Sequence, residues 1–279
     1  MANEKHLIPF TKMQATGNDF VVVDNRSLQL SKEDIIELTP EICDRNFGVG
    51  SDGILVLLPA EQNDIDYTMF FRNPDGSDAG MCGNGARCMA LFAHSLGFED
   101  KHRFNVHRKV YEAEIESPEK IRISFPMQAT AKDIMVRGRQ CYAIHTGTEH
   151  LVTTVDESML EDEEQLREEG ALLRHYTMFQ PKGTNANFIS GIDDSRLKLQ
   201  TYERGVEDLT LACGTGAIAS ALIWHHLQKQ RSADTYKYSV ETKGGTLSVY
   251  FSFNRNNQTY SNIKLEGPAH FVFKGEYMR

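Results

Sequence analysis

The feature that most constrains this chain is an internal repeat with a spacing of 131 residues. Residues 82–96 align without a gap with residues 213–227, since 213 − 82 = 131. Eight aligned positions are identical, among them the leading cysteine and the two glycines that follow it. A fainter match pairs residues 16–20 with residues 184–188. A spacing this long is not a solenoid period. It predicts two copies of one domain, each with an equivalent cysteine.

Each of these cysteines, Cys82 and Cys213, directly precedes a run rich in alanine and leucine, residues that favour a helix. Gly97 follows the first run and is a plausible helix stop. The unpaired N–H groups and the macrodipole at a helix start favour negative charge. A thiol placed there can ionise near neutral pH. The pattern therefore predicts a reactive thiol at the start of each repeated helix.

Two equivalent thiols suggest a particular chemistry. One thiolate with a histidine would suggest acyl transfer, whereas two matched thiols suit inversion at a carbon atom, with one as base and the other as acid. Two helix starts could hold the carboxylate on which charge develops. The glycines at positions 83, 85, 214 and 216 allow a close approach to that backbone. No lysine stands in an aldimine context and no cluster has metal-ligand spacing, so we expect neither a cofactor nor a metal.

Net charge and cysteine content restrict the partners and the cellular compartment that we expect. The net charge of −9 argues against nucleic acid and anionic membranes as partners. The longest apolar run, residues 54–58, is far shorter than the ~20 residues that span a bilayer, and the N-terminus lacks a signal-peptide pattern. Five cysteines without a C-x-x-C pair favour a reducing compartment. We expect a cytoplasmic protein that acts on a small molecule.

Local patterns predict a mixture of strands and helices. A capping sequence at Ser31 begins a helix that runs to Cys43, which Pro40 is expected to divide. Residues 48–53 match G-x-G-x-x-G, but a strand-like run follows instead of a helix, so we reject a dinucleotide site. The acidic run 156–169 reads as a solvated helix. Strands are expected at residues 8–13, 20–23, 54–59, 67–71, 104–116, 120–125, 140–146, 151–155, 185–190, 197–202, 236–242, 246–253 and 261–266, with a short apolar tail at 269–273 that returns to the first domain.

Two signatures resemble those of the diaminopimelate epimerase family. The first is Asn73-Pro-Asp-Gly-Ser followed by Cys82-Gly-Asn-Gly-Ala-Arg87. The second is Glu203-Arg-Gly followed by Ala212-Cys-Gly-Thr-Gly216. Residues 16–20 and 267–269 extend the resemblance to nearly the whole chain. It implies a cofactor-independent, two-base epimerase that interconverts LL- and meso-diaminopimelate, in lysine and peptidoglycan precursor synthesis.

The resemblance also implies a fold. It is an α/β (α+β) architecture of two pseudo-symmetric domains, each a mixed, mostly antiparallel β-sheet curled like a barrel around a central helix. We expect residues 1–126 with 270–279 to form the first domain, with Cys82, and residues 127–269 to form the second, with Cys213. The family is usually a homodimer.

The resemblance assigns roles to residues by position. Cys82 and Cys213 would be the paired acid and base, and His150 and Glu203 would adjust the thiol pKa values. The backbone of Gly83, Asn84, Gly214 and Thr215 would hold the reacting carboxylate. The amines and the distal carboxylate would be held by Asn18, Asn73, Thr148, Asn185, Glu203 and Arg204. The guanidinium of Arg204 suits a carboxylate because it can bind two oxygens at once.

Three positions depart from the family pattern. The usual Gly-Asn-Pro-His is Gly147-Thr-Glu-His150 here, so a hydroxyl replaces an amide at the distal end. A frequent glutamine is Gly53, and a tyrosine tied to dimerisation is Phe273. The remaining cysteines, Cys43, Cys88 and Cys141, are expected to be buried hydrophobes, and His94 and His225 to be structural.

Three other functions stay open at this point. A proline or hydroxyproline racemase or epimerase would share the fold and the paired cysteines. A hydrolase would use Cys82 as a nucleophile with His150 or His94, and would tolerate Cys213→Ser. A non-catalytic module would only bind an anion at the two helix starts, and would be insensitive to thiol alkylation.

Overall fold

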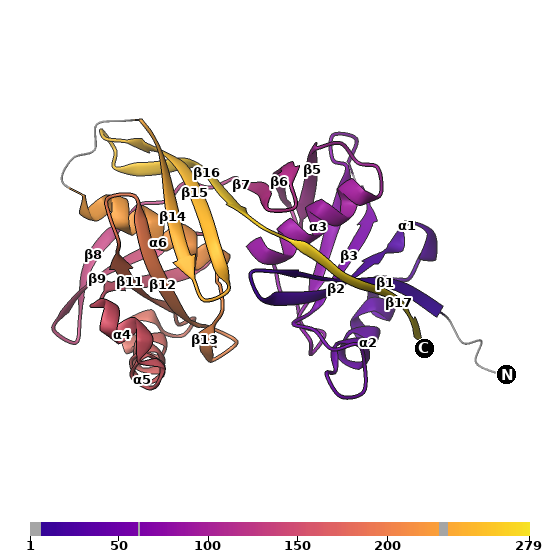
Figure 1. Ribbon diagram of the computed structural model, residues 1–279, viewed down its shortest axis with the longest axis horizontal. Coiled ribbons are helices and arrows are strands. Elements are labelled where there is room, and N and C mark those ends of the chain that lie inside the picture. The colour runs from indigo at the N-terminus through magenta and orange to yellow at the C-terminus, as the bar shows by residue number, and fades with distance from the viewer. Residues whose placement is uncertain (1–6, 61, 229–233) are drawn as a thin grey trace. The chain divides into compact units, whose positions relative to one another are not determined.

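The computed structural model describes residues 7–60, 62–228 and 234–279. It divides into two compact units (Figure 1). Unit 1 comprises residues 1–123 and 267–279, and unit 2 comprises residues 124–266. The expected changeovers after residues 126 and 269 lie three residues further along the chain than these boundaries. Residues 267–279 are grouped with unit 1.

The elements of unit 1 are β1 (Leu7–Ala15), β2 (Asn18–Asp24), α1 (Asn25–Leu28), α2 (Lys32–Cys43), β3 (Ile54–Pro59), β4 (Tyr67–Arg72), α3 (Gly83–Ser95), β5 (Lys101–Val106), β6 (Lys109–Ser117), β7 (Lys120–Phe125) and β17 (His270–Met278). Those of unit 2 are β8 (Lys132–Val136), β9 (Arg139–His145), β10 (Glu149–Thr154), α4 (Glu157–Glu161), α5 (Glu163–Arg174), the 3₁₀ turn η1 (Thr177–Phe179), β11 (Asn185–Gly191), β12 (Arg196–Glu203), β13 (Asp208–Thr210), α6 (Gly214–Leu227), β14 (Thr235–Thr242), β15 (Gly245–Asn254) and β16 (Thr259–Gly267). Strands β7 and β16 run across the two changeovers.

The two units share one strand-pairing pattern. In unit 1 the pairs β1–β2, β3–β4 and β5–β6 are antiparallel, and β2–β3 and β4–β5 are parallel. In unit 2 the pairs β9–β10, β11–β12 and β14–β15 are antiparallel, and β10–β11 and β12–β14 are parallel. Parallel neighbours need a crossover. The second crossover of each unit holds α3 or α6, which confirms the duplication predicted from the repeat.

The repeated helix is the centre of each unit. Helix α3 contacts β1, β2, β3, β4 and β6, and α6 contacts β9, β10, β11, β12, β14 and β15. Every residue of α3 from Gly83 to Ala93 is buried. A helix whose whole circumference is buried must be surrounded by other elements, and here these are the curled strands of its own unit. The expected fold class, strands around a central helix, is confirmed.

The fainter sequence match was wrong. It paired residues 16–20 with residues 184–188, but the β1–β2 turn at Thr16 and Gly17 corresponds in the shared topology to the β9–β10 turn at Thr146 and Gly147. Both glycines have a positive φ. The two turns differ in length, because Ala15 pairs with Asn18 whereas His145 pairs with Glu149. That extra residue obscured the correspondence, which lies at an offset of 146 − 16 = 130.

Some expected boundaries were also wrong. Pro40 does not divide α2, because Ile35, Leu38 and Ile42 hold the helix against the core on both sides of it. The expected strand 104–116 is two strands joined at residues 107–108, where His107 has a positive φ. Strands β8 and β13 were not expected at all.

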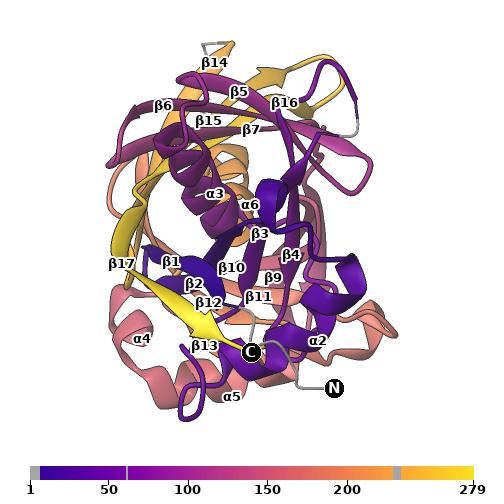
Figure 2. The same cartoon turned by 90° about the vertical axis from the view of Figure 1, so that its right-hand side faces the viewer.

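The last strand lies beside the first. β17 pairs with β1 in antiparallel fashion from Leu7 and Met278 to Gln14 and His270 (Figure 2). In β17 the apolar side chains of Phe271, Val272 and Phe273 are exposed. None of the helices in the described part of the chain combines the length and apolar character that crossing a membrane requires.

Candidate active site

Cys82 is the N-cap of α3. Its backbone is extended, and its sulfur accepts a hydrogen bond from the backbone N–H of Gly85 (3.4 Å). The thiol also donates to Oδ1 of Asn18 (3.7 Å), which comes from the start of β2. A backbone donor aimed at sulfur stabilises the thiolate more than the thiol. The structure therefore brings Cys82 and Asn18 together at the helix start that the repeat predicted.

A charged cluster holds Asn18 in this orientation. The amide nitrogen of Asn18 donates to Asp52 (2.7 Å), so its oxygen is turned toward the cysteine. Arg45 donates to both Asp52 (2.6 Å) and Asp19 (2.8 Å), and the buried Lys12 pairs with Asp19. Burial raises the pKa of Asp19, but the hydrogen bonds from Arg45 and Lys12 outweigh it and lower the pKa to about 2. The carboxylate of Asp52, which holds Asn18, is thus anchored by Arg45, and Arg45 also joins it to the Asp19–Lys12 pair.

The side chain of Asn84 points inward. Its Oδ1 accepts hydrogen bonds from the hydroxyl of Thr16 (3.1 Å) and from Arg87 (2.8 Å). Asn84 is 2% exposed, and Gly83 beside it is also buried. The side-chain amide of Asn84 is therefore committed to the protein, which leaves the backbone of this turn as the part able to serve an anion.

Asn73 lies in the loop between β4 and α3. Its amide nitrogen donates to the hydroxyl of Ser77 (3.0 Å), and its backbone N–H donates to the carbonyl of Ser77 (3.0 Å). These two bonds close the Asn73–Ser77 turn. The half-buried Asn73 thus has a structural role beside any contact with a ligand.

Cys213 is the N-cap of α6 and is buried. Its sulfur lies 3.6 Å from the hydroxyl of Thr215, and the carbonyl of Thr215 accepts from the hydroxyl of Thr146 (2.9 Å). Thr146 and Thr16 are thus equivalent, because each ties a β-turn to the first turn of the central helix of its unit. A Cβ on Gly216 would lie 2.7 Å from Oδ1 of Asn187, so only glycine lets α6 start this close to β11.

His150, in the same unit as Cys213, is buried and only 2% exposed. The amide nitrogen of Asn187 lies 3.0 Å from Nδ1 of His150, so Nδ1 accepts that hydrogen bond. Burial lowers the pKa of His150 to about 3; the bond from Asn187 opposes that fall, and the charge of Arg204 adds to it. The imidazole is therefore neutral at pH 7.

Arg204 follows β12 and gathers the expected distal-end residues. Its Nη2 donates to the hydroxyl of Thr148 (2.6 Å), and its backbone N–H donates to Oδ1 of Asn185 (2.8 Å). Its Nη1 pairs with the carboxylate of Glu149 (3.1 Å). Burial raises the pKa of Glu149, but hydrogen bonds and the charges of Lys182 and Arg204 produce a net lowering. Glu203, half-buried, is the last residue of β12.

Four polar residues of these half-sites were not assigned a role from the sequence: Asp52, Arg87, Glu149 and Asn187. A signal existed for Asn187, because it shares one face of a buried strand with Asn185 at a spacing of two residues. Asp52 lay in a turn interpreted only as a strand entry. The departure at position 53 is also explained: a Cβ on Gly53 would lie 2.5 Å from the carbonyl oxygen of Arg72.

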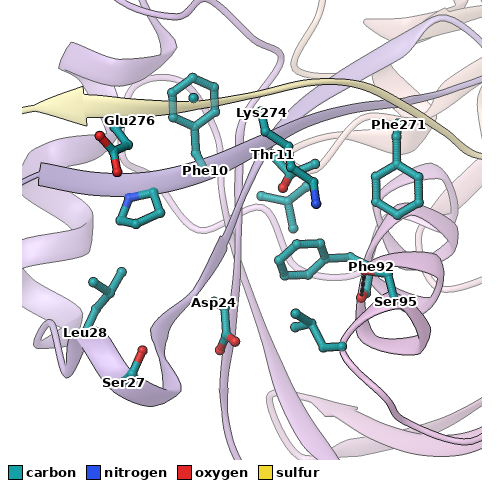
Figure 3. Close-up of a pocket in the computed structure, with 14 residues that line it drawn as sticks. Phe10, Thr11, Asp24, Ser27, Leu28, Phe92, Ser95, Phe271, Lys274 and Glu276 are labelled. Atoms are coloured by element: carbon teal, nitrogen blue, oxygen red, sulfur yellow. Dashed lines mark hydrogen bonds between the residues drawn. The ribbon is translucent and has the colours of Figure 1, made fainter.

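A hollow in unit 1 lies away from Cys82. It has a volume of about 750 Å³ and is lined by residues of β1, β2, α1 and β17 together with Phe92, Ser95 and Leu96 at and just after the end of α3 (Figure 3). Cys82 stands at the other end of that helix, and 13 residues of helix span about 20 Å. This hollow is therefore not the reaction site.

Two solved structures share the fold over nearly their whole length. A PhzF family phenazine biosynthesis protein of Bacillus anthracis superposes with a TM-score of 0.75 at 14% identity, covering 98% of this chain and 99% of that one. A hydroxyproline epimerase from Agrobacterium vitis, solved with bound trans-4-hydroxy-L-proline, superposes with a TM-score of 0.68 at 13% identity, covering 98% and 92%. The chain is of the two-domain fold class that these structures represent.

Sequence comparison identifies the family within that class. The family model for diaminopimelate epimerase matches residues 10–125 and 142–272. The diaminopimelate epimerase of Flavobacterium psychrophilum is 37% identical over 264 residues, which cover 94% of this chain and 97% of that protein. The chain belongs to the diaminopimelate epimerase family. It is therefore an isomerase that epimerises an amino acid.

Proposed function

We propose that this chain interconverts LL- and meso-diaminopimelate, with Cys82 and Cys213 as the paired acid and base. One observation carries the proposal: equivalent cysteines cap the buried central helices of two units that share one topology. Membership of the diaminopimelate epimerase family supplies the substrate and the reaction.

In the proposed reaction one cysteine acts as a thiolate and removes the proton from the α-carbon. The electron pair of the broken C–H bond moves into the carboxylate, which becomes a dianionic enediolate. The other cysteine, as a thiol, then donates its proton to the opposite face of the carbon. Thiol and thiolate have exchanged places at the end, so the reverse reaction uses the same groups in swapped roles.

The developing charge needs fixed donors. The backbone N–H groups of Gly83, Asn84, Gly214 and Thr215 would bind the reacting carboxylate, because the first turn of a helix leaves such groups unpaired. Two features support this role. The side chain of Asn84 is turned into the protein, away from the backbone donors, and Gly216 lets α6 begin close to β11.

The distal end would be held mainly in unit 2. The guanidinium of Arg204 would bind the distal carboxylate, with Asn185 and Thr148 beside it. The side-chain oxygens of Asn18, Asn73 and Glu203 would accept hydrogen bonds from the ammonium groups of the substrate. His150 would act on Cys213 as a neutral dipole, not as a cation, because its pKa is far below 7.

Solvent deuterium tests the proposal. Wild type in D₂O is expected to convert LL- to meso-diaminopimelate and to incorporate deuterium at one α-carbon. Cys82→Ala and Cys213→Ala are each expected to lose inversion by at least about 10³-fold. Cys88→Ala changes a cysteine in the second turn of the same helix, α3. It is the matched control and should retain activity. Inversion that survives either active-site change excludes the two-base mechanism.

The alternatives have less support. The likeness to a hydroxyproline epimerase is one of fold at 13% identity, against 37% identity to a diaminopimelate epimerase. A hydrolase acting through Cys82 would tolerate Cys213→Ala, so the same pair of variants separates it. Proline and hydroxyproline serve as comparison substrates in the deuterium assay.

We also infer that the chain is a cytoplasmic homodimer. Three consecutive exposed apolar residues of β17, Phe271, Val272 and Phe273, support a contact with a second copy. The free thiols of all five cysteines suit a reducing compartment. Light scattering should give twice the chain mass for wild type, and a monomer for Phe271→Glu combined with Phe273→Glu. A wild-type monomer at micromolar concentration contradicts the dimer.

A further inference from the structure

The buried arginine of unit 1 has no part in the scheme above. Arg87 lies on the second turn of α3 and is 0% exposed, the largest side chain among the fully buried ones in the described residues. Its guanidinium donates to the carbonyls of Pro268 (3.1 Å) and Gly83 (3.2 Å), to Oδ1 of Asn84 (2.8 Å) and to the hydroxyl of Thr16 (3.3 Å).

Each of these four acceptors is uncharged. Burial lowers the pKa of Arg87 to about 10, and a charge on Cys82 would oppose that fall. The guanidinium is therefore still a cation at pH 7. Burial raises the pKa of Cys88, so Cys88 is a neutral thiol at pH 7. Burying a cation among neutral acceptors is costly, since hydrogen bonds to carbonyls replace only part of its hydration.

The direction of the side chain adds to the cost. Helical side chains point toward the N-terminus of their helix, and the bond to the carbonyl of Gly83 shows that Arg87 does so. Its charge thus lies under the first turn of α3, where the helix dipole is already positive. An anion at the helix start would offset this cost.

The contacts also join three segments of unit 1. Gly83 and Asn84 form the first turn of α3, Thr16 lies in the β1–β2 turn that precedes Asn18, and Pro268 leads into β17. One side chain therefore fixes the start of α3, which bears Cys82, relative to the β1–β2 turn, directly after which lies Asn18, the hydrogen-bond partner of Cys82.

We propose that Arg87 is a positioning residue for the reaction: its charge favours the thiolate of Cys82 and the substrate carboxylate at the start of α3, and its planar fork fixes the backbone donors there. The part that concerns the carboxylate rests on the proposed function. The part that concerns Cys82 does not, since it is a property of the thiol alone.

Alkylation of Cys82 measures the effect on the thiol without any substrate. In a Cys213→Ala background, the rate of Cys82 modification by iodoacetamide is followed against pH by peptide mass spectrometry. Arg87→Met, which keeps the bulk and removes the charge, is expected to raise the midpoint by about one pH unit. Arg87→Lys, which keeps the charge and removes the fork, should leave the midpoint near that of the parent.

Epimerisation is measured with Cys213 intact. Arg87→Lys is expected to lower kcat by about 10-fold or more through loss of the fork, and Arg87→Met to lower it further and to shift the acid limb of the pH profile upward. The control is Arg103→Met, because Arg103 pairs with Asp64 and not with α3. It should change neither readout.

Each outcome decides the proposal. An unchanged alkylation midpoint in a folded Arg87→Met variant overturns the electrostatic role. If Arg87→Met does not fold, as judged by circular dichroism, Arg87→Lys decides: full kcat or a displaced midpoint overturns the proposal. If wild type fails to epimerise diaminopimelate, the proposed function falls, but the alkylation midpoints still report on Arg87 and Cys82.

Discussion

The guanidinium of Arg204 donates to the hydroxyl of Thr148 over 2.6 Å, between a strand end and the β9–β10 turn of the same unit. This contact lies at the position where the family usually has an asparagine. A hydroxyl can accept this bond as an amide oxygen would, but it is shorter and carries no NH₂ group. In this chain the smaller side chain of Thr148 holds Arg204 through its hydroxyl.

Removal of that hydroxyl should weaken substrate binding. Thr148→Val is nearly isosteric and leaves Nη2 of Arg204 without this acceptor, so we expect KM for diaminopimelate to rise about 10-fold with kcat nearly unchanged. Thr148→Asn is the matched variant and should keep KM within about 3-fold of wild type. Initial rates over a range of substrate concentrations measure both. A fall in kcat with constant KM would place Thr148 in the chemical step instead.

If Arg204 binds the distal carboxylate as proposed, Glu149 should compete with the substrate for it. Its carboxylate pairs with Nη1 of Arg204 (3.1 Å), the group expected to bind the distal carboxylate. Glu149→Gln removes this counter-ion and should lower KM by about 3-fold, since a partly exposed ion pair contributes at most about 1 kcal/mol. Glu157→Gln, which instead disturbs the pair with Lys198, is the control. A higher KM for Glu149→Gln would contradict this competition. It would mean that attraction between Glu149 and the distal ammonium group of the substrate outweighs the competition for Arg204.

Because of His150, the free energy of unfolding should decrease as the pH is lowered below 6.5. Its pKa is about 3 in the folded chain and about 6.5 when unfolded, so below pH 6.5 the unfolded chain binds more protons. The stability that depends on the neutral imidazole of His150 is thus fully present above pH 6.5. It is lost as the pH falls toward 3, at up to about 1.4 kcal/mol of unfolding free energy per pH unit.

Urea unfolding of wild type and His150→Gln at pH 7 and pH 5 measures this contribution. The variant is expected to lose less free energy of unfolding over that interval than wild type does. Equal losses would show that His150 is protonated in the folded chain. Burial also lowers the pKa of His102, so His102→Gln is the comparison that separates the two histidines.

Some of this site could be predicted from the sequence, because its signals are local. A cysteine, two glycines and an alanine-rich run predict a helix start, and the repeat predicts two of them. The partners across each unit could not be found in the same way. Asp52 holds Asn18 from a turn 34 residues away, and no local pattern encodes that distance. No local pattern marks Arg87 as buried either, because arginine is usually a surface residue.

Oxidation provides a test of the central requirement of the mechanism. If Cys82 and Cys213 act on opposite faces of one carbon, the two sulfurs must approach each other closely, and a mild oxidant should join them as a disulfide with loss of two hydrogens. Activity should fall as this species forms, as judged by peptide mass spectrometry, and should return with a thiol reductant. Cys43, Cys88 and Cys141 are buried in the units and should remain as free thiols. Inactivation that a reductant does not reverse, without a Cys82–Cys213 peptide, would argue for separate oxidation of one sulfur and against a shared substrate carbon.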